Sequence, residues 1–177
     1  FTAKHVILCG GAGAEALIRT AGIITDRLQV TSGQISLMPE HTSLSALSKT
    51  LNYGGYLIPV RHQAQICGAS FALSATTDIT VEAHHHNLAL MPEQLHSLAG
   101  DVDEFLGRTS LRLAVTDRLP LSGQIVPGLS VLSCLGARGL TNALFLADDL
   151  VRRLSGRPAL MDIPLQAALD PKRLRAC

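Results

Sequence analysis

A short turn bracketed by two glycines, Gly136 and Gly139, leads into a predicted helix whose apolar residues run from position 140 to 154 at helical spacing. Gly156 and Pro158 follow as stop signals. Glycines allow a ligand to approach the backbone closely, and the first helical turn leaves N–H groups unpaired, with partial positive charge. Such a turn can bind an anion or a ligand oxygen atom, although ordinary loop-to-helix turns have a similar composition.

Arg112 is the charged residue of a predicted strand over residues 110–115. An arginine within an apolar strand is costly to bury unless an anion pairs with it. Its planar fork of N–H donors suits a carboxylate held through two hydrogen bonds. A structural salt bridge to Asp117 would meet the same need.

Three consecutive histidines, His84 to His86, are the obvious candidate for a metal cluster. Consecutive residues point in different directions, however, so three in a row seldom bind one ion. We therefore predict no metal site and interpret the three histidines as a solvated polar turn. The turn leads into a helix over residues 87–98, which Pro92 interrupts or restarts.

The composition is that of a folded domain, with 177 residues, 47% hydrophobic and 16% charged residues. The formal net charge of +1 gives no electrostatic case for nucleic-acid binding by itself. Of the four cysteines, Cys9, Cys67 and Cys134 lie in apolar runs, and Cys177 ends the chain. We predict buried free thiols of a cytoplasmic protein rather than a disulfide framework.

Residues 5–11 predict a buried strand that ends in a glycine turn. Its glycines also fit the dinucleotide-binding pattern G-x-G-x-x-A weakly, because the helix that follows is short. Residues 54–60 and 65–70 predict a hairpin with a loop at 61–64. The uncharged run 119–137 contains two prolines and predicts a pair of short strands rather than a membrane span.

The segment from Arg112 to Gly123, followed by the turn Gly136-Ala137-Arg138-Gly139, resembles the C-terminal part of FAD-dependent amine oxidases. These form the D-amino acid oxidase and glycine oxidase superfamily. The run 117–121 and the tail 168–174 are most similar to the oxidase half of bifunctional enzymes that modify the tRNA wobble uridine. Ala137 departs from the serine usual in this turn, which removes a hydroxyl group but leaves the backbone donors.

The resemblance implies an α+β fold with a mixed, largely antiparallel substrate-domain sheet and the C-terminal strand and helix of an FAD-binding domain. The implied segments are 1–27, a returning part of the FAD-binding domain; 28–116, the substrate domain; and 117–177, a C-terminal FAD-contacting segment and helix. Because the chain begins at Phe1 in what resembles a mid-protein strand, we expect a C-terminal fragment that lacks the N-terminal Rossmann motif.

The resemblance also implies FAD as cofactor and assigns site residues. Arg112 is expected to bind the substrate carboxylate, and Arg138 to lie beside substrate and flavin. The hydroxyl of Tyr56 matches a second carboxylate ligand, although a half-buried sheet tyrosine explains it equally well. No catalytic base is expected, because a neutral amine can surrender hydride directly. The expected cofactor contacts are Cys9, Gly10, Gly11, Gly136, Ala137, Arg138, Gly139, Leu140 and Thr141.

The implied reaction is oxidation of the carboxymethylaminomethyl group on the tRNA wobble uridine, which releases glyoxylate and leaves aminomethyl-uridine. One alternative is a glycine, sarcosine or D-amino-acid type of oxidase that acts on a free small molecule; another is an inactive fragment or interaction module. Expected partners are tRNA, the missing N-terminal FAD-binding section and a fused methyltransferase domain, and we expect no membrane. Basic residues available for tRNA are Arg152, Arg153, Arg157, Lys172, Arg173 and Arg175.

Overall fold

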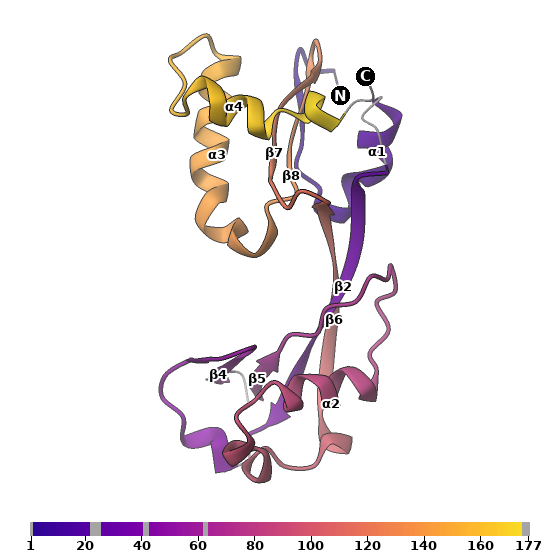
Figure 1. Ribbon diagram of the computed structural model, residues 1–177, viewed down its shortest axis with the longest axis vertical. Coiled ribbons are helices and arrows are strands. Elements are labelled where there is room, and N and C mark those ends of the chain that lie inside the picture. The colour runs from indigo at the N-terminus through magenta and orange to yellow at the C-terminus, as the bar shows by residue number, and fades with distance from the viewer. Residues whose placement is uncertain (1, 22–25, 41–42, 62–63, 175–177) are drawn as a thin grey trace. The chain divides into compact units, whose positions relative to one another are not determined.

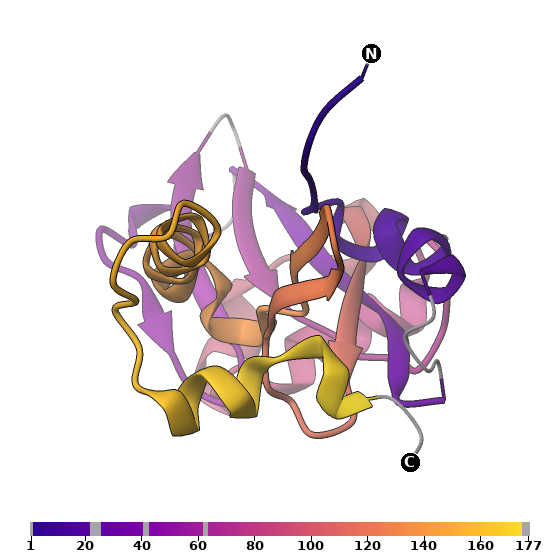
Figure 2. The ribbon, with the colours of Figure 1, turned by 90° about the horizontal axis from the view of Figure 1, so that it is seen from above.

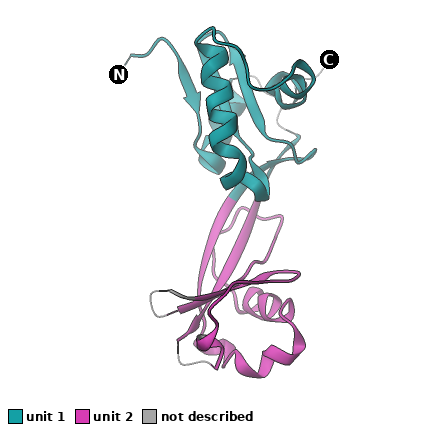
Figure 3. Cartoon of the chain, turned by 90° about the vertical axis from the view of Figure 1, so that its left-hand side faces the viewer, with its two compact units in different colours: residues 1–30, 112–177 teal, residues 31–111 magenta. Residues whose placement is uncertain are grey.

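The computed structural model describes residues 2–21, 26–40, 43–61 and 64–174. The chain divides into two compact units (Figure 3). Unit 1 comprises residues 1–30 and 112–177, and unit 2 comprises residues 31–111. The first and third segments expected from the sequence thus belong mainly to one unit, and the expected substrate domain corresponds mainly to the other.

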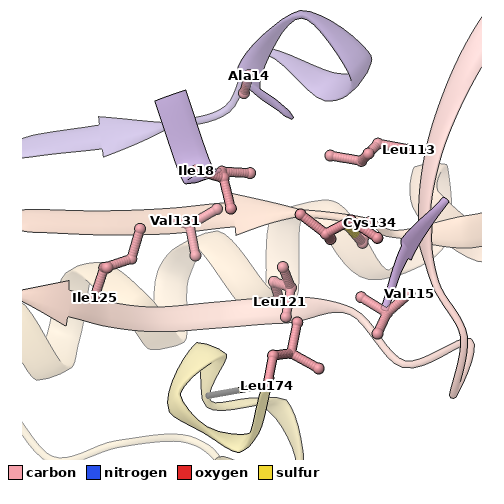
Figure 4. Packing of buried hydrophobic residues seen from close by; sticks show 10 residues of the cluster. Ala14, Ile18, Leu113, Val115, Leu121, Ile125, Val131, Cys134 and Leu174 are labelled. Atoms are coloured by element: carbon pink, nitrogen blue, oxygen red, sulfur yellow. The ribbon is translucent and has the colours of Figure 1, made fainter. Parts of the chain in front are cut away.

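Unit 1 contains a three-stranded sheet in the order β1-β8-β7, formed by β1 (Val6–Leu8), β8 (Leu129–Ser133) and β7 (Leu121–Val126). β1 is parallel to β8, whereas β7 and β8, the two short strands predicted for the run 119–137, pair antiparallel. The hairpin lies between helix α1 (Glu15–Thr20) and helix α3 (Gly139–Leu154) (Figure 1, Figure 2). Apolar side chains from both strands and from α1 form the core, including Ile18, Leu121, Ile125, Val131 and Cys134 (Figure 4).

Helix α3 ends where the sequence predicts. Gly156 has a left-handed φ of +69°, and its N–H donates to the carbonyl of Arg153 at 3.3 Å. The N–H of Arg157 donates to the carbonyl of Arg152 at 2.9 Å. These two bonds form a Schellman motif, which glycine makes possible because it has no Cβ to clash in this conformation.

A buried carboxylate joins α3 to the segment that follows it. Asp149 is fully buried and accepts an Nε hydrogen bond from Arg153 at 2.7 Å. It also accepts backbone N–H bonds from Leu160 and Met161 at 2.8 and 3.0 Å. The chain continues into α4 (Ile163–Leu169), capped by Asp162, and the 3-10 turn η6 (Pro171–Leu174), neither of which was predicted.

Unit 2 contains a five-stranded sheet in the order β3-β4-β5-β2-β6. β4 and β5 form the predicted hairpin, and β5 also pairs antiparallel with β2. Buried side chains on one face of the sheet, among them Leu57, Cys67 and Met38, pack against Met91 and Phe105. The strands are β2 (Leu28–Pro39), β3 (Leu51–Asn52), β4 (Tyr56–Arg61), β5 (Ala64–Gly68) and β6 (Leu106–Val115).

The predicted solvated turn at the three histidines is wrong. They lie within helix α2 (Val81–Ala89), whose N-cap Thr80 accepts a hydrogen bond from the Ala83 N–H. The helix ends at Ala89, and a 3-10 helix, η3 (Glu93–Leu98), follows Pro92 in place of the helix predicted over 87–98. The sequence-based interpretation failed because it placed the helix start six residues too late.

One histidine of the three faces the core. His84 is buried, and its Nδ1 lies 2.8 Å from the hydroxyl of Ser36 on β2. Asn87, one helical turn later, donates to the same hydroxyl and to the carbonyl of Gln34, both at 3.0 Å. His85 and His86 are exposed. Helical spacing therefore separates the three histidines, and the described residues contain no cluster of metal-ligating side chains.

Among the described residues, no helix combines the length and the apolar character that crossing a lipid bilayer requires.

Candidate functional site

The glycine turn before α3 is accessible and has an unusual backbone. Gly136 has a φ of +65°, and Cys134, two residues earlier, has a φ of +56°. A left-handed conformation is costly for a residue with a side chain, and such residues are concentrated at functional sites. No heavy atom lies within 4 Å of the Cβ position on Gly136, so the turn faces open space. The expected cofactor contacts Ala137, Arg138, Leu140 and Thr141 are all exposed.

The second predicted cofactor segment lies at the same edge of the sheet in unit 1. β1 and β8 are parallel and Leu8 pairs with Val131, so their carboxyl ends meet at one edge. Cys9, Gly10 and Gly11 follow β1, as the glycine turn follows β8. Gly11 also has a positive φ, +54°, and open space at its Cβ position. Ligands of sheets with parallel strands bind outside these carboxyl ends.

This edge of the sheet is more exposed than the sequence analysis predicts. The predicted buried strand is an exposed one, because β1 lies at the edge of its sheet, and Val6 is 47% exposed. Cys9, predicted to be buried, is also exposed, whereas Cys67 and Cys134 are buried free thiols as expected. Cys177 lies outside the described residues. An apolar run alone does not reveal on which strand the sheet ends.

The donor set at this edge fits the flavin end of FAD. The ring system of a flavin carries carbonyl oxygens that accept hydrogen bonds, and the start of the 16-residue helix α3 presents unpaired N–H groups with partial positive charge. Gly136 and Gly11 leave space for a planar ring to approach this backbone. The fit depends on the main chain, so Ala137 in place of a serine does not affect it.

Arg112 is exposed rather than buried, which corrects the argument from the apolar strand. Positions 106, 108, 110 and 112 of β6 form its exposed side, while Leu113 and Val115 are buried. Arg112 makes no hydrogen bond or ion pair within the described part of the chain. Its guanidinium group is therefore available to an external anion.

The proposed salt bridge from Arg112 to Asp117 is wrong. The carboxylate of Asp117 instead accepts two hydrogen bonds from Arg173, at 2.9 and 3.2 Å, and one from the Leu119 N–H at 2.8 Å. Although burial acts to raise the pKa of Asp117, the hydrogen bonds from Arg173 and Leu119 lower it below its ordinary value. Asp117 thus stabilises the turn after β6, where Arg118 has a φ of +60°.

Tyr56 lies in unit 2 and is half-buried, as a sheet tyrosine is expected to be. Its hydroxyl lies 3.5 Å from the position that a Cβ on Gly68 would occupy, and it makes no hydrogen bond among the described residues. The neighbouring Tyr53 differs, because its hydroxyl contacts the Cys67 sulfur at 3.8 Å and burial raises its pKa. The hydroxyl of Tyr56 is therefore not used to hold the fold together.

Three of the six basic residues expected to bind tRNA are neutralised within the chain. Arg152 pairs with Asp148, Arg153 with Asp149 and Arg173 with Asp117, at 3.1, 2.7 and 2.9 Å. Arg157 and Lys172 are exposed and have no ion pair within the described residues, and Arg175 lies outside those residues. The helical spacing of four residues could have identified the first two pairs from the sequence.

The sequence analysis missed one basic residue of β6. Arg108 lies on the same exposed side of the strand as Arg112 and, like it, makes no hydrogen bond or ion pair among the described residues. The signal was available, because residues four apart in a strand face the same way.

Comparison with known proteins gives the following relationships. A model of the FAD dependent oxidoreductase family, DAO, matches residues 1–153. The chain is 32% identical to the tRNA 5-methylaminomethyl-2-thiouridine biosynthesis bifunctional protein MnmC of Caulobacter sp. (strain K31), over 95% of this chain and 28% of that protein. It is 29% identical to the MnmC protein of Aeromonas hydrophila subsp. hydrophila, over 97% of this chain and 30% of that protein.

Solved structures show the same fold. Iminodiacetate oxidase from Chelativorans sp. BNC1 superposes with a TM-score of 0.72 at 21% identity, covering 97% of this chain and 47% of that one. Glycine oxidase from Geobacillus kaustophilus superposes with a TM-score of 0.74 at 18% identity, covering 98% and 46%. The chain therefore spans less than a third of these curated relatives and less than half of these structural neighbours.

Proposed function

Because the chain belongs to the FAD dependent oxidoreductase family, we propose that it forms part of an FAD-dependent amine oxidase. Family membership confirms the resemblance inferred from the Arg112 segment and the glycine turn. The α+β architecture with an antiparallel sheet in unit 2 also agrees with the fold expected from the sequence. The observation that carries the proposal is the open edge of unit 1, where two glycine turns present backbone donors.

The proposed substrate is the carboxymethylaminomethyl group on the tRNA wobble uridine, with glyoxylate and aminomethyl-uridine as products. The names and identities of the MnmC relatives support this choice. Oxidation of a free small amine is the second candidate, supported by the fold shared with iminodiacetate and glycine oxidases. The substrates of both candidates carry a carboxylate next to the amine, so they place the same demand on the site.

Arg112 is the residue that we assign to this carboxylate. Its guanidinium is unpaired and exposed, and a planar fork of donors binds a carboxylate bidentately. FAD, when bound, accepts the hydride that leaves the carbon next to the amine nitrogen. The chain is required to orient the amine and to stabilise the flavin end through the backbone donors from Gly136 to Thr141. We also assign Arg138 and Tyr56 to the substrate side, as proposals.

Rapid-mixing flavin absorbance tests this function. Full-length protein with FAD is mixed anaerobically with an RNA stem-loop that carries carboxymethylaminomethyl-uridine, and separately with glycine and sarcosine. We expect the RNA to bleach the flavin and glyoxylate to appear. Bleaching by the free amines alone would select the second candidate, and no bleaching by any of the three would exclude amine oxidation of this type.

A further inference from the structure

The sheet of unit 2 has two unlike faces. On one face, Leu57, Cys67 and Ser36 are buried against the helical side of the unit. The alternate residues of the same strands are half-buried and form what we call the outer face. Register places Tyr56, Gly68 and Ile35 in one row across β4, β5 and β2, and Ile58, Ile66 and Leu37 in the next row.

Gly68 lets its neighbours in the first of these rows pack closely, and it is itself buried. A Cβ at this position would lie 3.2 Å from Cγ2 of Ile35, which would have to shift, and 3.5 Å from the hydroxyl of Tyr56. The accessible aliphatic surface beside the tyrosine hydroxyl is instead provided by half-buried side chains, those of Ile35, Leu37, Ile58 and Ile66. The Tyr56 hydroxyl has no partner among the described residues and is free to bind a ligand.

Arg108 extends this row on the neighbouring strand. β6 lies next to β2, and the Thr109 hydroxyl approaches Oε1 of Gln34 at 3.5 Å on the inner face. Since successive residues of a strand point to opposite faces, Arg108 lies on the outer face, beside Ile35. It is exposed and has neither a hydrogen bond nor an ion pair among the described residues.

The outer face has charge of one sign only. Its described positions carry aliphatic, small and hydroxyl side chains together with the guanidinium of Arg108, and no carboxylate. An unpaired arginine over an aliphatic floor complements a ligand with a flat apolar ring and an attached anion. Those positions are Ile35, Leu37, Tyr56, Ile58, Ala64, Ile66, Gly68, Leu106, Arg108 and Ser110.

We propose that Arg108 binds a phosphate group of a nucleotide-borne amine substrate, whose base lies over the half-buried Ile35. The assignment rests on the proposed amine oxidation and deepens it by naming the residue that distinguishes a nucleic acid from a free amine. Guanidinium matches phosphate through paired hydrogen bonds, and an exposed contact of this kind depends on salt. Arg108 is thus a specificity-determining residue that contacts a non-reacting part of the substrate.

Binding and turnover together test this assignment. Full-length Arg108→Gln is compared with wild type and with Lys4→Gln, which removes an exposed lysine of unit 1 that has no ion pair among the described residues. RNA affinity is measured by fluorescence anisotropy of the modified stem-loop at several salt concentrations, without turnover. We expect the affinity for RNA to fall roughly tenfold, which corresponds to a loss of ~1.4 kcal/mol of binding free energy. The slope of log K against log salt should fall by about 0.7, the value for one single-strand phosphate contact.

Flavin reduction by sarcosine should be the same in Arg108→Gln and wild type, and Arg108→Lys should recover part of the RNA affinity. Lys4→Gln should bind RNA as wild type does. Unchanged RNA affinity in Arg108→Gln would overturn the assignment, as would an equal loss of sarcosine reduction. If none of the amines reduces the wild-type flavin, the proposed oxidation is wrong. The anisotropy measurement still tests whether Arg108 binds the RNA, because it does not depend on turnover.

Discussion

The helices of unit 2 cover one face of its sheet, although Phe71, Leu73 and Leu106 of the same unit are exposed. In unit 1, apolar side chains of α3 and β1 are exposed. Leu140 and Leu144 on α3 are 96% and 82% exposed, and Val6 on β1 is 47% exposed. On the inner face of unit 2, hydrogen bonds join the buried polar side chains of Ser36, His84 and Asn87, although Oδ1 of Asn87 and Oε1 of Gln65 have no partner among the described residues. Parallel strand pairs such as β1 and β8 are normally covered on both faces.

The two units therefore differ in which residues complete their apolar packing. Unit 2 has a core that its own residues complete, so its stability is a property of this sequence. The apolar surface of unit 1 requires a cover, and the structural neighbours are more than twice as long as this chain. We expect the FAD-binding section of such an enzyme to provide that cover.

The largest expected effect concerns FAD. The 177-residue chain alone should bind FAD weakly or not at all, because the backbone donors that we assign to FAD in unit 1 would contact only the flavin end of the cofactor. The complete enzyme should retain it. Gel filtration with absorbance detection measures the amount of bound flavin. Stoichiometric FAD on the isolated chain, with no other polypeptide present, would refute this view of unit 1.

Asp149→Ala should destabilise unit 1 by about 3 kcal/mol, because it removes a buried carboxylate that binds Arg153 and two backbone N–H groups. Urea unfolding of the isolated chain measures the change. Asp148→Ala is the matched control, since Asp148 pairs with Arg152 on the exposed side of the same helix, and it should change stability by less than about 1 kcal/mol. Similar losses in the two variants would contradict the role of burial.

Asn87→Ala should destabilise unit 2 by about 2 kcal/mol. The change removes a buried donor from the Ser36 hydroxyl and from the Gln34 carbonyl, which keeps only the bonds from Ser70. His86→Ala, an exposed substitution on the same helix, should stay within about 0.5 kcal/mol of wild type. Hydrogen exchange resolved by segment would show the loss of protection in residues 31–111, and loss confined to unit 1 would contradict it.

The smallest expected effect is a difference between the two units in how their stability depends on pH. Burial lowers the pKa of His84 below its ordinary value of 6.5, so the unfolded chain takes up this proton first. Stability from neutral His84 is therefore present above pH 6.5 and is lost as the pH falls through 6.5 towards the lowered folded pKa. Replacing His84 with glutamine should flatten this part of the stability profile of unit 2.

Unit 1 should respond at lower pH. Hydrogen bonds lower the pKa values of Asp117 and Asp149 below the ordinary 3.8, despite the opposing effect of burial. Their contribution is present above pH 3.8 and is lost as the pH falls through the folded pKa values. Segment-resolved hydrogen exchange from pH 7 to pH 3 should therefore show unit 2 losing protection first. Simultaneous loss in both units would argue against two separate titrations.

Much of the fold was predictable because its signals are local. Apolar spacing and Gly156 determined α3, and prolines and alternating residues indicated the β7–β8 and β4–β5 hairpins. The glycine turn before α3 was identified for the same reason. Its assignment to FAD, and those of Arg112, Tyr56 and Arg138 to substrate, are still predictions.

The parts that the sequence did not reveal depend on contacts between distant segments. Asp117 binds Arg173, 56 positions away, rather than the nearby Arg112. His84 is buried because Ser36, 48 positions away, lies opposite it. Cys9 is exposed because β1 is the last strand of its sheet in the described chain.

The sequence by itself therefore determined helix α3, the strand pairs β4–β5 and β7–β8, and the membership of an oxidase family, since these depend on neighbouring residues and short motifs. Only the tertiary structure decided which charges are neutralised and which guanidinium groups remain available. Spacing along the chain gives the direction of a side chain within its own element, but strand order and register decide what lies opposite it.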